Sequence, residues 1–139
     1  MREILFRGKQ NEGKWVEGSY FKHDTVKVCF SSDDPKPRHL IIQDGFCDWG
    51  FEPPIHCVDV DPETVGQYIG KTDGYDEKIF DGDVVEYKND SDERGKIVYN
   101  EDTAMYEVEF DTWVTDFDHI EGFHLEVIGN IHDDPEFLD

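Results

Sequence analysis

Paired cysteines are absent from the sequence. Its three cysteines, Cys29, Cys47 and Cys57, stand apart, and none belongs to a Cys-x-x-Cys motif. An odd number of unpaired cysteines argues against a disulfide framework and is typical of reduced thiols. Long apolar runs are absent as well: no segment approaches the roughly 20 apolar residues of a membrane-spanning helix. The start of the chain, MREILFRGK, holds no apolar run of signal-peptide length. We therefore expect a cytoplasmic protein without membrane contact.

Basic residues are few. The chain has 13 Lys and Arg against 34 Asp and Glu, a net charge of −21. Residues 1–64 carry 8 basic and 12 acidic side chains (net −4), whereas residues 65–139 carry 5 and 22 (net −17). So negative a chain repels nucleic-acid phosphates, and we do not expect it to bind nucleic acid directly. The acidic half leaves three interpretations: a solvated surface, a face for a basic protein partner, or a mimic of DNA.

Alternation of apolar and polar residues dominates what the sequence does contain. Aromatic residues make up 14% of the chain, which favours a folded protein over a disordered one. Short alternating segments recur about every 8–15 residues with turn residues between them, a pattern that predicts strands. The expected strands cover residues 1–7, 15–21, 25–30, 40–43, 55–60, 84–87, 96–99, 105–110 and 125–131.

This spacing predicts a mostly β fold with at most one short helix. The last four strands would form a small SH3-like barrel. We expect an N-terminal β-hairpin part at residues 1–61 joined to a C-terminal small β-barrel part at residues 62–139, as two domains or as one continuous domain. Exposed strand edges have to be covered, and self-association is one way to cover them, so we also expect a homo-oligomer.

The stretch Pro62–Glu86 joins the two parts. Residues 61–63, Asp-Pro-Glu, combine an N-cap residue, a proline suited to the first helical position and an acid in the first turn, so they predict one helical turn. Residues 81–83, Asp-Gly-Asp, predict a tight turn in which Gly82 takes a positive φ. Residues 112–122 are acidic and aromatic.

Three blocks of sequence are informative because of their order. They are MREILFRGK with GKWVEGSYF near the start, PETVGQYIG with KIFDGDVVE in the centre, and LEVIGNIHDDPEFL at the end. Together they resemble the YopX-like family, which phages and prophages of Gram-positive bacteria encode. The resemblance implies a phage or prophage origin, a location in the host cytoplasm, a mostly β fold and homo-oligomers. It brings no catalytic residue and no activity.

The chain departs from the family pattern in its central hairpin. The family commonly carries Asn-Gly where this chain has Tyr75 and Asp76. A turn with two positive-φ residues suits Tyr poorly. We therefore expect the turn to shift so that Gly74 takes the special conformation. The strong acidity after residue 65 is a second departure.

Carboxylates gather around the turn at residues 81–83. Asp73, Asp76 and Glu77 lie nearby in the sequence, and hard cations bind several carboxylate oxygens. Their spacing does not match a calcium-binding loop, however. We interpret the aspartates as caps of local backbone N–H groups.

Four residues of the first half, His39, Cys47, His56 and Cys57, are of the types that bind zinc. Zinc sites usually show two close pairs, whereas adjacent His56 and Cys57 would point to opposite faces of a strand. We interpret the cysteines as buried, small apolar side chains and the histidines as surface residues. No metal-ligating residue is assigned.

Three histidines of the second half, His119, His124 and His132, lie among acids. No nucleophile elbow, Walker loop or dinucleotide fingerprint accompanies them. We therefore assign no catalytic residue, no cofactor-binding residue and no cofactor, and we predict that the protein is not an enzyme.

The basic residues of the first half are the remaining candidates for a nucleic-acid surface. They are Arg2, Arg7, Lys9, Lys14, Lys22, Lys27, Lys36 and Arg38. Arg2 and Arg7 equally suit ion pairs with the acidic half.

The sequence thus predicts a non-enzymatic phage accessory protein that acts as an oligomeric or protein-interaction module. The alternative is an acidic DNA mimic or inhibitor of a host nucleic-acid-binding protein, with the acids of residues 73–121 in rows on one face. We expect the functional surface at Trp113–His124 or Phe46–Phe51.

Overall fold

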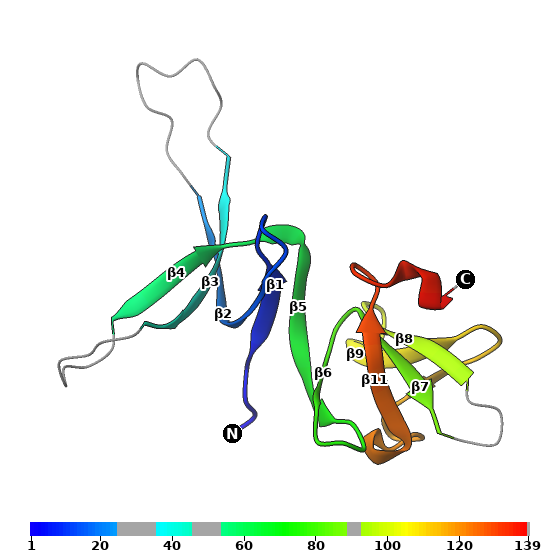
Figure 1. Ribbon diagram of the computed structural model, residues 1–139. Helices are drawn as coiled ribbons and strands as arrows, with labels where there is room; N and C mark the ends of the chain where they lie inside the picture. The colour runs from blue at the N-terminus through cyan, green and yellow to red at the C-terminus, as the bar shows by residue number, and fades with distance from the viewer. Residues whose placement is uncertain (25–35, 46–53, 89–92, 139) are drawn as a thin grey trace. The chain divides into compact units, whose positions relative to one another are not determined.

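The computed structural model describes residues 1–24, 36–45, 54–88 and 93–138 (Figure 1). Eleven strands and two short 3-10 helices lie in this described part, which contains no α-helix. The predicted mostly β fold is confirmed. The chain divides into two compact units. We call Ile4–Val65 the N-terminal unit, and Gly66–Asp139 together with Met1–Glu3 the C-terminal unit. The predicted division into domains at residues 1–61 and 62–139 is a statement about independent folding, and it stays a prediction.

The first six strands are antiparallel neighbours in the order β4-β3-β2-β1-β5-β6, and β5 is divided between the two units. Their alternating sequences account for the pairing, because apolar residues at every second position share one face of a sheet. The strands are β1 (Phe6–Lys9), β2 (Trp15–His23), β3 (Arg38–Asp44), β4 (Ile55–Asp59), β5 (Asp61–Thr72) and β6 (Lys78–Phe80).

The core of the N-terminal unit is small. Strand register places Tyr20 opposite Ile41 and Ile41 opposite Val58, so the three side chains share one face. Val16 and Val60 complete the buried cluster, and Phe6, Tyr20 and Val65 pack against it. Val60 lies so close to Gly8 that a Cβ at Gly8 would stand 2.9 Å from it, which explains the glycine.

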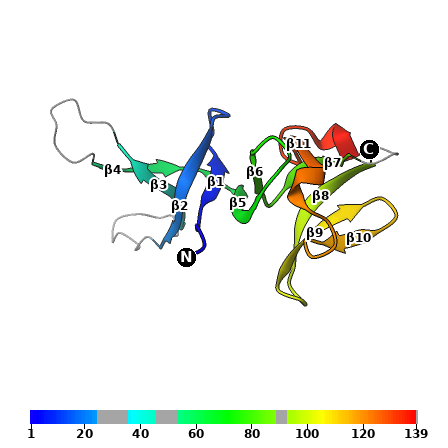
Figure 2. The same ribbon diagram turned by 90° about the horizontal axis from the view of Figure 1, so that it is seen from below.

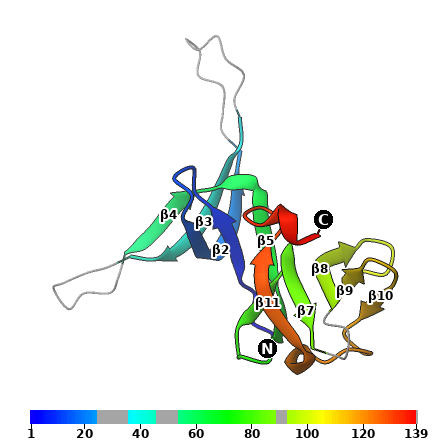
Figure 3. The same ribbon diagram turned by 45° about the vertical axis from the view of Figure 1, so that its right-hand side comes forward.

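The other five strands form a sheet of the C-terminal unit, in the order β10-β9-β8-β7-β11. Figure 2 shows β8, β9 and β10 in succession, and Figure 3 shows β11 beside β7. This sheet is compatible with an SH3-like barrel, a finer description that stays a prediction. The elements are β7 (Asp83–Tyr87), β8 (Glu93–Asn100), β9 (Met105–Phe110), β10 (Val114–Asp116), η1 (Gly122–His124), β11 (Leu125–Asn130) and η2 (Pro135–Leu138).

The core of the C-terminal unit is the larger of the two. Ile97 lies opposite Val108 on the face that is turned inward. A fully buried aliphatic side chain contributes about 1.5–3 kcal/mol relative to an exposed one, so this cluster is the main source of the unit's stability. Its buried members are Ile79, Val85, Ile97, Val108, Phe110, Ile120 and Leu125.

The turn at residues 81–83 forms as predicted. Gly82 has a φ of 87°. Its N–H donates to the Ile97 carbonyl at 3.0 Å, and its own carbonyl accepts from the Ile131 N–H at 2.9 Å. Asp83 is buried, and its Oδ2 accepts from the Phe80 N–H at 2.8 Å. The interpretation of Asp83 as a turn cap is confirmed, and the turn ties β6, β8 and the end of β11 together.

The predicted helical turn at residues 61–63 is wrong, because β5 begins at Asp61. The local cap does form: Asp61 Oδ1 accepts from the Glu63 N–H at 3.0 Å. However, Thr64 is buried and its Oγ1 accepts from the Lys9 N–H at 2.8 Å, which fastens the segment to β1. Pairing with a neighbouring strand outweighs the local helix signals.

The predicted conformation of Gly74 is also wrong. Asp76 has the positive φ, at 63°. The hairpin closes when the Asp73 N–H donates to the Glu77 carbonyl at 2.8 Å and the Asp76 N–H donates to the Asp73 carbonyl at 3.2 Å. Asp tolerates the left-handed region better than most residues because its short side chain hydrogen-bonds locally.

The strand predictions differ from the structure in extent. The strand at residues 105–110 matches β9, whereas the first strand begins at Phe6 instead of Met1. The short strand β10 lies within the acidic and aromatic residues 112–122. The strand predicted at residues 25–30 lies outside the described residues.

Candidate functional site

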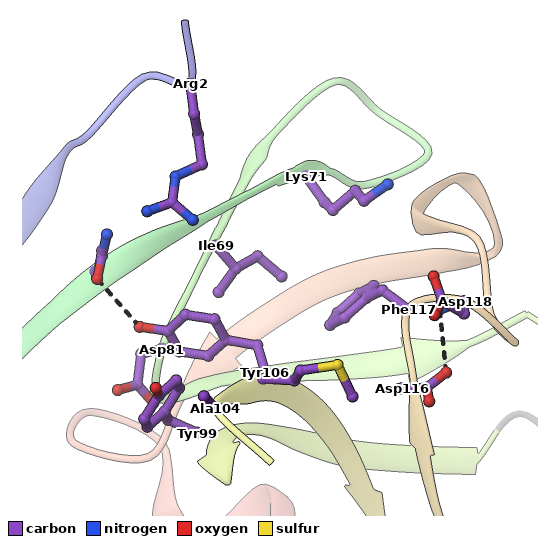
Figure 4. Close-up of a pocket in the computed structure, with 12 residues that line it drawn as sticks. Arg2, Ile69, Lys71, Asp81, Tyr99, Ala104, Tyr106, Asp116, Phe117 and Asp118 are labelled. Carbon is purple, nitrogen blue, oxygen red and sulfur yellow. Dashed lines mark hydrogen bonds between the residues drawn. The ribbon is translucent and has the colours of Figure 1, made fainter. Parts of the chain in front are cut away.

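A cavity of about 640 Å³ lies within the C-terminal unit (Figure 4). Its walls come from β5, the β6–β7 turn, the β8–β9 hairpin, the segment that starts in β10 and the beginning of the chain. The lining residues are Arg2, Gln67, Ile69, Lys71, Asp81, Tyr99, Ala104, Met105, Tyr106, Asp116, Phe117 and Asp118. They combine aromatic rings with charges of both signs, so the cavity suits an amphiphilic ligand.

Two tyrosines form the aromatic wall. Tyr99 and Tyr106 are directly opposite on β8 and β9, and their ring centroids lie 5.1 Å apart at an interplanar angle of 60°. Tyr99 remains 46% exposed. Ile69 and Phe117 face the same space from β5 and the segment after β10 (Figure 4). The wall therefore offers a ring surface that a ligand can contact.

The Tyr106 hydroxyl is turned toward β5. Its O–H donates to Gln67 Oε1 over a long 3.5 Å. Burial, then the negative charge of Asp81, raise the pKa of Tyr106 to about 12, while the positive charge of Arg2 acts in the opposite direction. The phenol is therefore a neutral hydrogen-bond donor near pH 7 and does not act as a base there.

Charged groups surround these rings. Gln67, Ile69 and Lys71 all line the cavity from β5, whose register with β6 shifts between Tyr68 and Thr72. Figure 4 shows Arg2 and Lys71 on the β5 side of the cavity and Asp116 with Asp118 beside Phe117. The cavity thus carries two cationic and three carboxylate side chains.

Asp116 also holds a histidine outside the cavity lining. Its Oδ1 lies 2.6 Å from His119 Nδ1 and accepts from the Asp118 N–H at 3.1 Å. The hydrogen bond to Asp116 raises the pKa of His119, and the same bond lowers the pKa of Asp116. His119 is exposed, so this pair orders the β10 end of the cavity without forming a buried catalytic dyad.

The YopX protein family model matches residues 5–139. The chain belongs to the YopX family. The resemblance drawn from the three sequence blocks is confirmed. Membership indicates a phage-type protein and supplies no activity. No curated protein matches the chain by sequence.

The other histidines of this YopX-family chain lie elsewhere. His124 is in η1, where its ring centroid is 6.3 Å from that of Tyr87. His132 follows β11, and its N–H donates to Asn130 Oδ1 at 3.0 Å. His119, His124 and His132 therefore occupy three separate places.

The residues weighed for zinc are not brought together where they are described. His39 is on β3 beside Tyr20, whereas His56 and Cys57 are exposed on β4. The interpretation of the cysteines as buried is therefore wrong for Cys57. Cys47 lies outside the described residues. Within the described ranges, no group of three or more His, Cys, Asp or Glu is arranged to hold a metal ion, and no helix is long and apolar enough to cross a membrane.

The basic residues of the first half serve different structures. Arg2 enters the cavity described above. Arg7 and Lys9 lie over the Trp15 ring, with the charged groups 4.9 and 6.0 Å from its centroid. Arg38 binds Asp59 through two hydrogen bonds of 3.1 and 2.9 Å. Lys14, Lys22 and Lys36 are exposed, and Lys27 lies outside the described residues.

The acidic-aromatic stretch Trp113–His124 contributes to the cavity only in part. Asp116, Phe117 and Asp118 line it. Trp113 instead stacks on Phe110, with ring centroids 4.4 Å apart, and donates to Glu93 Oε2 at 2.8 Å. The other predicted surface, Phe46–Phe51, lies outside the described residues.

Sequence reasoning missed the remaining walls of the cavity. The period-two pattern of residues 67, 69 and 71 was the available signal, since it puts their side chains on one face of an extended strand. The contribution of Tyr99 and Arg2 carried no such signal, because it depends on contacts between segments far apart in the chain.

Proposed function

We propose that this YopX-family chain is a non-enzymatic accessory protein that acts in the host cytoplasm by binding a basic protein partner through its C-terminal unit. The observation that carries the proposal is the aromatic, carboxylate-bearing cavity inside the more acidic unit. The C-terminal unit has 6 Lys and Arg against 23 Asp and Glu, a net charge of −17. Such a field attracts a basic partner and accelerates its association.

The side chains of the cavity support binding over catalysis. The described lining contains no pairing of a nucleophile with a base. Tyr106, the most buried of its tyrosines, keeps its proton near pH 7 because its pKa is raised. Contact through rings and carboxylates requires neither a nucleophile nor a proton acceptor.

DNA mimicry, the alternative, receives less support. A mimic needs free carboxylates in rows, but several acids of residues 73–121 are engaged within the unit. Glu86 Oε1 lies 2.7 Å from Lys88 Nζ, and Glu109 Oε1 lies 3.4 Å from Lys96 Nζ. Asp73 and Asp83 are buried. Asp73 and Asp83 are therefore not available as surface phosphate mimics, and a lysine offsets the charge of Glu86 and of Glu109.

Self-association is a further part of the proposal. β4 stands at one end of the strand order, and Ile55 on this strand is 75% exposed. An apolar side chain on an end strand favours pairing with a second copy. Light scattering of the full chain tests this part: a monomer at every concentration used contradicts it.

The binding proposal is tested by capture from host lysate. We expect the tagged full chain to retain a basic protein at about 0.05 M salt and to release it at about 0.5 M, because salt screens exposed charges. Neutralising three exposed acids of the C-terminal unit (Glu101→Gln, Asp102→Asn, Asp118→Asn) should weaken capture. A matched triple variant of the N-terminal unit (Glu12→Gln, Glu17→Gln, Asp24→Asn) should not. Capture of no basic protein at either salt concentration overturns the proposal.

A further inference from the structure

We infer that the cavity of the C-terminal unit binds an arginine side chain of the partner, with the guanidinium on the Tyr99–Tyr106 wall and the carboxylates of Asp81, Asp116 and Asp118 bordering the same cavity. This inference rests on the proposed function, because it names the group that the basic partner inserts. The site is one contiguous hollow of about 640 Å³, which accommodates a side chain and the adjoining peptide backbone.

The aromatic wall favours a planar cation. Tyr99 is 46% exposed, and its ring is inclined at 60° to Tyr106, so a guanidinium that stacks on one ring meets the edge of the other. Arginine stacks on aromatic faces through both its charge and its planar π system, whereas the compact ammonium of lysine has only the charge. The geometry therefore favours arginine over lysine.

The carboxylates favour the same ligand. Asp81, Asp116 and Asp118 border the cavity from different segments. A guanidinium presents several N–H donors in one plane and can bind a carboxylate through two parallel hydrogen bonds while a second face remains on a ring. Of these carboxylates Asp118 is exposed and lies in the segment beside Phe117, which makes it the most accessible to an entering side chain.

The chain itself places a guanidinium in this cavity. Arg2 lines it, and Figure 4 shows the Arg2 guanidinium directed toward Ile69 and Tyr106. Its positive charge acts on the Tyr106 phenol. The segment Met1–Glu3 is held to β6 by an exposed ion pair, with Glu3 Oε1 3.2 Å from Lys78 Nζ. Exposed ion pairs are weak, so Arg2 is an internal competitor that a partner's arginine can displace.

Because of this competition, the direction in which affinity changes on removal of Arg2 distinguishes a cationic ligand from an anionic one. Arg2 and Lys71 repel an entering cation and attract an entering anion. If the ligand is a guanidinium, removal of Arg2 strengthens binding. If the ligand is a carboxylate or phosphate, the same change weakens binding.

The test is a titration of the full chain with capped pentapeptides that differ at one residue, monitored by NMR. The arginine peptide (Gly-Gly-Arg-Gly-Gly) should shift the Tyr99 and Tyr106 resonances. The citrulline peptide, which has the same shape without charge, should bind about tenfold more weakly or worse, and the lysine peptide should be intermediate. A glutamate peptide should not bind.

The second measurement is the affinity of protein variants for the arginine peptide. Arg2→Ala should raise the affinity for the arginine peptide about three- to tenfold, and Asp118→Asn should lower it by a similar factor. Tyr99→Ala should lower affinity about tenfold, whereas Tyr99→Phe, which keeps the ring, should retain it. Asp111→Asn and Tyr75→Ala, at exposed positions outside the lining, are the matched controls.

Weaker binding of the arginine peptide by Arg2→Ala, or equal binding of the citrulline peptide, overturns the inference. Basic-protein capture that persists while the arginine peptide fails to bind would leave the proposed function standing and reject the arginine site alone. If the peptides bind with the expected effects of the variants but no basic protein is captured, the arginine site stands and the proposed function is rejected.

Discussion

The two units use the same strand alternation but manage charge differently. The N-terminal unit has 7 basic and 11 acidic side chains (net −4) around a buried cluster of four residues. The C-terminal unit has 6 and 23 (net −17) around a buried cluster of seven. Excess charge opposes compaction through self-repulsion. Among the residues that the structure describes, the unit with more repulsion also has more apolar burial to offset it.

The C-terminal unit also uses its carboxylates as structural groups. Glu86 lies opposite Arg94 in the register of β7 and β8, and Glu109 lies opposite Lys96 on β9 and β8. Lys88 Nζ lies 2.8 Å from Glu126 Oε2 and 2.7 Å from Glu86 Oε1, and the hydrogen bonds that Lys88 donates to these two carboxylates raise its pKa. Cross-strand pairing of opposite charges stabilises a sheet, so part of the acidity supports the fold instead of opposing it.

The largest effect expected comes from the two cores. Leu125→Ala in the C-terminal unit and Ile41→Ala in the N-terminal unit should each cost about 2–5 kcal/mol, because both side chains are buried and their removal leaves a cavity. Urea unfolding monitored by residue-resolved NMR should show each loss in the unit that carries the change. Ile4→Ala, at a 60% exposed position, is the control. One common midpoint for all residues in every variant would mean that the units unfold as one domain.

Local pattern was sufficient where a feature depends on neighbours in sequence. The β9 strand and the Gly82 turn are examples, since alternation and a glycine between aspartates determine them. It failed at Asp61, where the cap forms but pairing through Thr64 keeps the chain extended. Local pattern also failed at Asp76. The hydrogen bonds that close the hairpin determine which residue takes the positive φ, and the presence of Gly74 two residues earlier does not.

The cavity could not be predicted because its walls are distant in the sequence. Residue 2, residues 67–71, residue 81, residues 99–106 and residues 116–118 meet only after the sheet has formed. The functional surface expected at Trp113–His124 stays a prediction. Alternation could not show that Asp116 and Phe117 line the cavity with Tyr106 while Trp113 packs on Phe110.

The second prediction concerns Asp73, a buried carboxylate that accepts hydrogen bonds from three backbone N–H groups. Its Oδ1 accepts from the N–H groups of Tyr75 and Glu77 at 2.8 and 2.9 Å, and its Oδ2 accepts from the Val127 N–H at 2.9 Å. Asp73→Asn should destabilise the C-terminal unit by about 1–3 kcal/mol, because an amide NH₂ then faces a buried donor. Urea unfolding measures the loss. Asp111→Asn, an exposed aspartate of the same unit, should change stability little, and an equal loss in both variants would contradict a specific role for Asp73.

The third prediction compares one hairpin turn from each unit. Gly13 in the β1–β2 turn has a φ of 91°, and Asp76 in the β5–β6 turn has a φ of 63°. Gly13→Ala should destabilise by about 1 kcal/mol, since Ala is strained at positive φ. Asp76→Gly should stabilise by up to about 1 kcal/mol because the strain is relieved, less the added freedom of the unfolded chain. Thermal unfolding of both variants checks the two signs, and a loss in Asp76→Gly would show that the Asp76 side chain contributes more than its backbone strain costs.

The smallest effect is the titration of one partly buried tyrosine from each unit. Burial raises the pKa of Tyr20 in the N-terminal unit. Burial together with the Asp81 charge raises the pKa of Tyr106 in the C-terminal unit to about 12. The difference in phenolate absorbance between the unchanged protein and Tyr106→Phe should therefore titrate near pH 12. The same difference for Tyr20→Phe reports the titration of Tyr20, whose pKa is raised by burial.

Two further variants separate burial from charge in this shift. Asp81→Asn should lower the pKa of Tyr106, and Arg2→Ala should raise it, because Asp81 and Arg2 act on the phenolate with opposite signs. The fold favours the neutral phenol, so its contribution to stability is complete below the usual tyrosine pKa of about 10 and is lost as the pH rises toward about 12. An unchanged Tyr106 titration in Arg2→Ala would place the Arg2 guanidinium away from the cavity in solution. The pKa of Tyr106 would then be set by burial and by Asp81, whereas burial raises the pKa of Tyr20.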